Sequence, residues 1–345
     1  MAHYHEPELQ APVDLARADG RLNRAAVGWS RHPVHRCNLT WSERRPKRWN
    51  YWCFTGPDHL VSIAVSDRGI VAAGSVTFLR YADRRFHELV AQIPFDTGQG
   101  LPMPERVRGD LTFQHDGVEI LMRETGPTET ELRGRGHLPD GTLVEAHIVV
   151  ERPAEHETLN VVIPWSDETY QFTSKQECLP AEGRIRIGRE VFAFAPGSAF
   201  GTLDYGRGFW PSRSIWNWAA ASGRQSGRVV GLNLGGKWTD GTGMNENGFV
   251  IDGQLTKIHE DLVWEYDDRD FMRPWRIYAP STGLVDVVFS PVYERRSETA
   301  VPEQGYERRV SQVFGHFEGT IRPRAGEAIE LSGLFGWAEE LTAVW

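Results

Sequence analysis

The chain has 345 residues, of which 40% are hydrophobic and 25% are charged, as is usual for a globular protein. Its formal net charge is −9, which argues against binding to nucleic acid, because that binding depends on basic side chains at the phosphates. The three cysteines are far apart and odd in number. They therefore indicate neither a disulfide framework nor a thiolate metal site, and a reducing cytoplasm fits best.

The N-terminus is polar and lacks the apolar stretch of a signal peptide. No run of about 18 apolar residues occurs anywhere, so we expect a soluble, cytoplasmic protein without a transmembrane segment. Residues 1–24, with Pro7 and Pro12, are expected to form an extended arm over the surface. The pairs His3/His5 and His32/His35 have ligand-like spacing but no supporting third ligand, so no metal site is predicted.

Residues 38–56 combine basic and aromatic side chains. A basic run at 44–48 is followed by aromatic residues, a pattern that could bind single-stranded nucleic acid. The acidic balance of the chain and the lack of a second such run favour a different interpretation, a first β-strand with one buried face. We predict no nucleic-acid partner.

Most of the remaining chain has the pattern of short β-strands. Segments rich in β-branched and aromatic residues alternate with Gly, Pro or polar breaks. Asp-Gly pairs at 116–117, 140–141 and 252–253 predict hairpin turns. A helical pattern over about ten residues is found only at 298–312. The spacing predicts an all-β fold with sandwich or barrel architecture.

The length favours two β units, which we place at residues 25–180 and 181–345, with a junction near 177–190. An internal similarity supports this division. Residues 47–66 and 213–235 both combine a Trp-Asn strand, a polar turn with glycine, and an apolar strand. If the similarity is real, each unit begins with a related hairpin.

Residues 194–247 carry the richest set of candidate ligand-binding side chains. Tryptophans, asparagines and charged residues stand there among glycines, as the lining of a pocket requires. The alternative is a set of strand ends and tight turns around a tryptophan-rich core. With the first aromatic strand added, the predicted ligand-binding residues are Arg48, Trp49, Tyr51, Trp52, Tyr205, Arg207, Trp210, Trp216, Asn217, Trp218, Asn233, Trp238, Asn245 and Asn247.

Asp204 and Glu246 are the candidate catalytic residues. Burial against indoles raises the pKa of a carboxyl group, which makes it a competent general acid near neutral pH. Two carboxylates also suit glycoside hydrolysis. The alternative is structural: Asp204 would cap a turn, and Glu246 would pair with Arg207 or Arg213. Dinucleotide, P-loop, serine-elbow and zinc-protease motifs are missing from the sequence, and we predict no cofactor.

Several motifs in order, GWSR, KRWNYW, FAPGSAFGTLDYGRGFWP, SIWNWA, GLNLG and TGMNEN, resemble the bacterial family known as domain of unknown function 2804. More distantly, LDYGRG followed by WNWA is similar to the DHxWG and Trp-x-Trp motifs of lipocalin-like proteins related to carotenoid hydratase and AttH. Asp204 matches the aspartate of that motif, whereas Tyr205 stands in place of its histidine. The resemblance implies two lipocalin-like antiparallel β-barrel or sandwich units in tandem, with a ligand cleft.

These observations lead to three hypotheses. The first is a lipocalin-like protein that binds an apolar or amphipathic small molecule in an aromatic cleft, and that acts, if it is an enzyme, as a cofactor-free hydratase, isomerase or lyase with Asp204 as general acid. The second is a carbohydrate-active or carbohydrate-binding protein that uses tryptophan faces with Asp204 and Glu246. The third is a binding module without catalysis.

Overall fold

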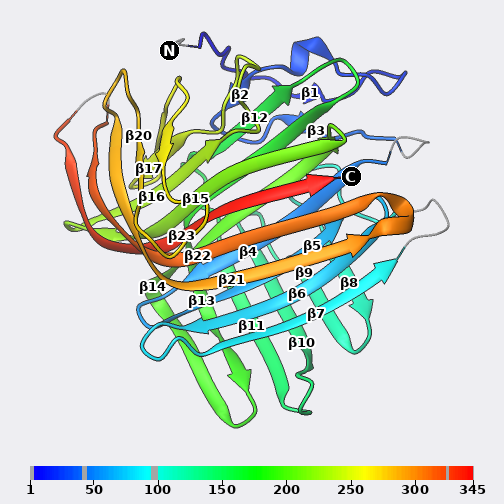
Figure 1. Cartoon of the computed structure of the whole chain (residues 1–345), viewed down its shortest axis with the longest axis vertical. Helices are drawn as coiled ribbons and strands as arrows, with labels where there is room; N and C mark the ends of the chain where they lie inside the picture. The colour runs from blue at the N-terminus through cyan, green and yellow to red at the C-terminus, as the bar shows by residue number, and fades with distance from the viewer. Residues whose placement is uncertain (1–3, 41–44, 95–99, 324–325, 345) are drawn as a thin grey trace.

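The computed structural model describes residues 4–40, 45–94, 100–323 and 326–344 (Figure 1). Within these ranges the chain is almost entirely β. The helices there are two short 3-10 turns, η1 (Arg24–Ala26) and η2 (Pro302–Gln304). The all-β prediction is therefore confirmed. The helical pattern at 298–312 was misleading, because those residues form the η2 turn and the strand ends on either side of it.

The first sheet has twelve strands, and its main path runs β7-β6-β5-β4-β14-β13-β11-β10-β9-β8, with β12 paired to β13 and β2 paired to β12. Strands β6 and β7 also contact β8 and β9, so the sheet curls into a nearly closed barrel around one apolar core. The strands are β2 (Trp29–Ser30), β4 (Lys47–Thr55), β5 (His59–Asp67), β6 (Val71–Arg80), β7 (Phe86–Pro94), β8 (Leu111–His115), β9 (Val118–Glu124), β10 (Glu129–His137), β11 (Leu143–Glu151), β12 (Leu159–Pro164), β13 (Tyr170–Ile187) and β14 (Glu190–Phe209).

The second sheet has nine strands in the order β18-β17-β16-β15-β23-β22-β21-β20-β19 and forms a half-barrel with its own core. Its long strands lie across the first sheet in Figure 1. The strands are β15 (Arg213–Gln225), β16 (Arg228–Gly236), β17 (Gly248–Ile251), β18 (Gln254–Lys257), β19 (Val263–Glu265), β20 (Trp275–Tyr278), β21 (Val285–Val301), β22 (Tyr306–Ile321) and β23 (Ile329–Val344). A separate parallel pair joins β1 (Val13–Asp14) and β3 (His35–Arg36).

The three predicted Asp-Gly turns join consecutive antiparallel strands. Asp116 and Asp252 have positive φ values of 44° and 47°. The glycines that follow them are also positive, as a tight two-residue hairpin turn requires. The similar segments 47–66 and 213–235 form two such antiparallel pairs, β4-β5 and β15-β16.

Residues 177–190, where we placed the junction, lie within strands β13 and β14 and the turn between them. Both strands belong to the first sheet, and the chain enters the second sheet only between Phe209 and Arg213. The lack of an apolar block there has a simple reason: Arg184 and Arg186 alternate with the buried Ile185 and Ile187. The division into two folding units stays a prediction.

The described part of the N-terminal segment, residues 4–24, is anchored by buried side chains. Leu15 and Leu22 are fully buried, and Glu6 reaches the second sheet. Glu6 accepts a hydrogen bond from the Asn245 amide at 2.8 Å and pairs with Lys257 Nζ at 2.8 Å and His259 Nδ1 at 2.6 Å. We call Glu6, Lys257 and His259 the N-terminal cluster. Of the paired histidines, His5 is exposed, His35 is buried, and His3 lies outside the described residues.

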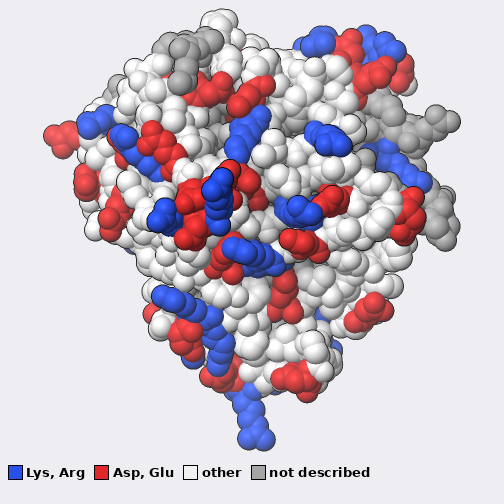
Figure 2. All heavy atoms as spheres, viewed as in Figure 1, with Lys and Arg blue, Asp and Glu red and all other residues white. Residues whose placement is uncertain are grey.

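Charged side chains of both signs are interspersed on the face shown in Figure 2. Elsewhere in the described chain, exposed charges form pairs such as Arg276 with Asp286 and Arg296 with Glu294. This face therefore presents no broad basic surface.

Candidate functional site

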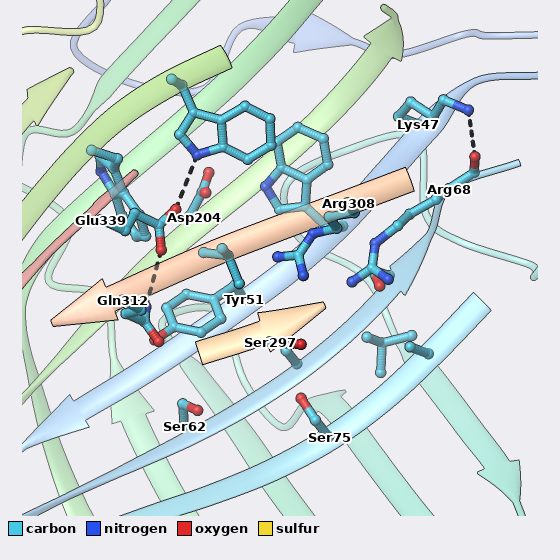
Figure 3. A pocket seen from close by; sticks show the side chains of 18 of the residues that line it. Lys47, Tyr51, Ser62, Arg68, Ser75, Asp204, Ser297, Arg308, Gln312 and Glu339 are labelled. Atoms are coloured by element: carbon cyan, nitrogen blue, oxygen red, sulfur yellow. Dashed lines mark hydrogen bonds between the residues drawn. The ribbon is translucent and has the colours of Figure 1, made fainter. Parts of the chain in front are cut away.

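A partly enclosed cavity of about 320 Å³ lies between the two sheets. Its walls come from β4–β7 and β13–β14 of the first sheet and from β15 and β21–β23 of the second. Figure 3 shows Tyr51, Ser62 and Ser75 on one wall, facing Ser297 and Gln312 on the other. Both sheets are needed to form this cavity.

Strand β14 supplies the aspartate of the site. Successive residues of a strand point to opposite faces, so Asp204 faces the cavity while its neighbours Leu203 and Tyr205 pack into the barrel core. Asp204 lies opposite Lys175 on β13 and opposite Tyr51 on β4. The pairing of three neighbouring strands therefore places these side chains side by side.

Lys175, Asp204 and Glu246 form what we call the cavity cluster. Lys175 Nζ lies 3.0 Å from Asp204 Oδ1 and 3.3 Å from Glu246 Oε2. Its ammonium also stands 4.1 Å from the centre of the Trp218 ring, within cation–π range. Burial disfavours the charged lysine, but the two carboxylates outweigh this effect and raise the pKa of Lys175.

The two glutamates of the site, Glu246 and Glu339, are both buried. Burial raises the pKa of Glu246, although Lys175 opposes the shift and Trp238 Nε1 donates a hydrogen bond to it at 2.8 Å. Burial also raises the pKa of Glu339 on β23. Glu339 accepts hydrogen bonds from Trp216 Nε1 at 3.0 Å and Gln312 Nε2 at 3.2 Å.

Indole rings form the apolar part of the lining. Trp210 lies 5.3 Å from both Trp216 and Trp238, measured between ring centres, and 5.9 Å from Trp49. Trp49 crosses over Gly206, its partner on the neighbouring strand. A Cβ atom at Gly206 would lie 2.1 Å from that indole, so only glycine permits this packing.

Half of the sequence-predicted residues line the cavity and half do not. Those that line it are Trp49, Tyr51, Asp204, Trp210, Trp216, Trp218, Trp238 and Glu246. The structure places outside this lining Arg48, Trp52, Tyr205, Arg207, Asn217, Asn233, Asn245 and Asn247.

The residues outside the lining have other contacts. Trp52 stacks on Phe54 in the barrel core. Arg207 donates to Asn50 Oδ1 at 2.7 Å, and its guanidinium covers the Tyr205 ring at 3.8 Å. Arg48 pairs with Asp67. Strand alternation explains this set, because these side chains point away from the face that carries Asp204.

The asparagines support the site from behind. Asn233 accepts from Trp218 Nε1 at 2.8 Å and donates to the backbone of Glu246 at 2.5 Å. Asn217 donates to Tyr266 and to the backbone of Glu339. Asn245 and Asn247 both donate to the Glu260 carbonyl. These amides hold backbone and indole groups in place, as buried polar side chains usually do.

Sequence reasoning missed Lys175, Glu339, Arg68, Arg308 and Gln312, all of which line the cavity. A weak signal existed for two of them. Lys175 interrupts a strand at 170–176, and Glu339 follows the apolar run before the C-terminus. A charged residue inside a strand of otherwise buried character indicates a buried partner, although it does not say which one.

Among residues 4–40, 45–94, 100–323 and 326–344, no group of three or more His, Cys, Asp or Glu side chains is arranged to hold a metal ion. No helix in these ranges is long and apolar enough to cross a membrane.

Comparison with solved structures gives the fold. Kievitone hydratase from Nectria haematococca is 11% identical, with a TM-score of 0.52 over 87% of this chain and 89% of that one. A protein described as a putative AttH from Nitrosomonas europaea is 12% identical, with a TM-score of 0.47 over 86% of this chain and 92% of that one. At these identities the first similarity shows a shared lipocalin-like fold and nothing about the reaction. No curated protein matches the sequence. A family model does match residues 6–345, and the chain therefore belongs to the family described as domain of unknown function (DUF2804).

Proposed function

We propose that this protein binds an amphipathic small molecule in the cavity between its two sheets and transfers protons on it. The observation that carries the proposal is the gathering of three buried carboxyl groups, Asp204, Glu246 and Glu339, on an aromatic-lined cavity. Adding or removing water and shifting a double bond are reactions that such a site can perform, because each needs a positioned proton donor and acceptor.

Glu339 and Asp204 suit opposite roles. Burial raises the pKa of Glu339, a shift in the direction that a proton donor requires. Asp204 pairs with Lys175 and accepts a hydrogen bond from Thr173 Oγ1 at 3.3 Å, contacts that suit a carboxylate able to accept a proton. In the reverse direction of the same reaction the roles exchange, and Asp204 is then the general acid that the sequence suggested.

Lys175 and the indoles complete the proposed site. The Lys175 ammonium compensates the negative charge of Asp204 and Glu246 next to the ligand. The Trp218 ring lies against this ammonium and holds it in position. The faces of Trp210, Trp216 and Trp238 give an apolar ligand broad contact and exclude water. Exclusion of water strengthens the interactions between charged groups and ligand.

The carbohydrate hypothesis is supported less well. Glycoside hydrolysis needs two carboxyl groups with room between them for the sugar bond or a water molecule. Lys175 Nζ lies within 3.3 Å of both Asp204 and Glu246. An ammonium in that place pairs the two groups with itself rather than with a glycosidic oxygen.

Native mass spectrometry of the purified protein tests the binding part of the proposal. We expect a copurified small molecule that is lost in Ser75→Trp, which fills the cavity from β6. Ser290→Trp, on an exposed face of β21, is the matched control and should retain it. Retention of the same adduct by a folded Ser75→Trp variant would refute binding in this cavity.

Isotope exchange tests the catalytic part. The extracted ligand is incubated with the protein in deuterium oxide, and the gain of carbon-bound deuterium is followed by mass spectrometry. We expect exchange with the wild type and a loss of at least about a hundredfold in Glu339→Gln and Asp204→Asn, as for removal of a general acid or base. Binding without exchange in the wild type would leave the third hypothesis, a binding module.

A further inference from the structure

The cavity is charged differently at its two ends. Asp204 and Glu339 lie toward one end in Figure 3, and Arg68, Arg308 and Lys47 lie toward the other. Arg308 comes from β22 of the second sheet, whereas Arg68 directly follows β5 of the first. The second sheet and the segment that follows β5 of the first therefore each contribute one guanidinium group to the same part of the cavity.

Neither of these two guanidinium groups forms a close ion pair with an acidic side chain in the described part of the chain, although Glu339 attracts Arg308 at longer range. Nearby acids are already engaged: Asp67 pairs with Arg48, and Glu88 pairs with Arg295. The Lys47 ammonium instead donates to the Arg68 carbonyl, which adds positive charge to this end. Guanidinium groups that meet in a partly buried place without a close ion-pair partner repel one another.

The titration of the cationic groups agrees with this geometry. Burial, followed by repulsion from Arg68, lowers the pKa of Arg308 to about 9. Burial also lowers the pKa of Lys47 to about 8, although Asp67 opposes the shift. Both shifts would be reversed by a negative charge placed between these groups.

We infer that Arg68 and Arg308 bind the anionic head of the ligand, a carboxylate or a phosphate, while its apolar body lies among the indoles. Two guanidinium groups match the paired oxygens of such a head. Ser75, Ser297 and Thr299 also line the cavity and offer hydroxyl donors. The ligand is then oriented in one direction, with its reacting part at Asp204 and Glu339.

This inference rests on the proposed function, since it assigns the ligand class of the same cavity. It adds a direction and a charge that the fold alone does not imply. A neutral isoprenoid or a sugar would leave the two guanidinium groups uncompensated, whereas an amphipathic anion satisfies them.

The test uses decanoate, decyl phosphate and decanol as probes, with binding to the full chain followed by quenching of tryptophan fluorescence. We expect at least one of the two anions to bind about tenfold to a hundredfold more tightly than decanol, the range expected for hydrogen bonds to a charged group. Preference for decanoate identifies a carboxylate head, and preference for decyl phosphate identifies a phosphate head.

Arg308→Gln and Arg68→Gln should each remove most of this preference while leaving decanol binding unchanged. Arg309→Gln is the matched control, because Arg309 is exposed on the same strand and pairs with Glu307. Equal affinity for decanol and both anions would overturn the inference but keep the proposed cavity function. An equal loss in the Arg309→Gln variant would also overturn it. If none of the three probes binds, the proposed function itself fails.

Discussion

Two buried clusters among the described residues pair a lysine with carboxylate, and they differ in what surrounds them. In the N-terminal cluster, both Glu6 oxygens are used, by the Asn245 amide on one side and by Lys257 and His259 on the other. The Glu6 side chain has no exposed surface. In the cavity cluster, Asp204 keeps 8% exposure and faces an open volume.

The difference shows that burial of charge alone does not identify a functional site. The N-terminal cluster compensates its charges with protein groups and ties the start of the chain to β18, which is a structural role. The cavity cluster has compensating groups on only one side, and on the other side it meets a space large enough for a ligand. A shifted pKa indicates a functional site when the titrating group borders such a space.

The largest effect should come from breaking the N-terminal cluster. Glu6→Gln removes the ion-pair partner of the buried Lys257 ammonium, and we expect the free energy of unfolding to fall by about 3–5 kcal/mol. Urea denaturation measures this change. Glu8→Gln is the control, because its partner Arg31 lies at the surface, and it should cost at most about 1 kcal/mol. Equal losses of stability in the two variants would show that the Glu6 carboxylate does not compensate the charge of Lys257.

A smaller, pH-dependent effect should come from Glu177, another buried carboxyl outside both clusters. Burial raises its pKa from the ordinary value of 4.5 to about 8, although Thr202 and Ser222 donate hydrogen bonds to it. Between these values the folded state holds a proton that the unfolded chain has lost, so stability should fall as the pH rises, by up to about 1.4 kcal/mol per pH unit.

Glu177→Gln removes this titration, and the free energy of unfolding should then vary less between pH 5 and about pH 8 than in the wild type. Denaturation at several pH values tests the sign directly. An unchanged slope in the variant would show that Glu177 is ionised in the folded protein.

The smallest effect on stability should come from Asp204→Asn. The variant keeps the shape of the side chain, and the cavity admits water to the remaining polar groups, so we expect a cost below about 1 kcal/mol. The contrast with Glu6→Gln is the sharpest form of the comparison, since each variant neutralises one carboxylate beside a buried lysine. Urea denaturation of both variants under the same conditions measures the two changes in the free energy of unfolding. A cost for Asp204→Asn as large as for Glu6→Gln would make Asp204 a structural residue.

Much of the fold follows from local sequence. The alternation of apolar and polar residues predicts strands, and the Asp-Gly pairs predict where hairpins turn, because both features depend on residues next to each other in the chain. The helical elements of the described residues are two short 3-10 turns. The tryptophan-rich segment also places part of the cavity, since Trp210, Trp216, Trp218 and Trp238 all line it.

The alternation of side chains between the two faces of a strand decided which of the predicted residues face the cavity. Asp204 and Tyr205 are neighbours in sequence, and the pleat sends one to the cavity and the other into the barrel core. A shift of one residue in pairing would exchange them. The sequence contains the pattern but not the register, because the register depends on partners far along the chain.

The sequence by itself determined that this is an all-β protein with a tryptophan-rich segment able to line a pocket, because strand pattern and turn chemistry are local properties. The tertiary structure alone decided that Lys175 and Glu339 join Asp204, and that Arg68 and Arg308 meet across the cavity. Lys175, Asp204 and Glu339 come from three different strands, Arg308 comes from the second sheet, and Arg68 directly follows β5 of the first sheet. Their meeting depends on the packing of one sheet on the other, a long-range outcome that no local pattern records.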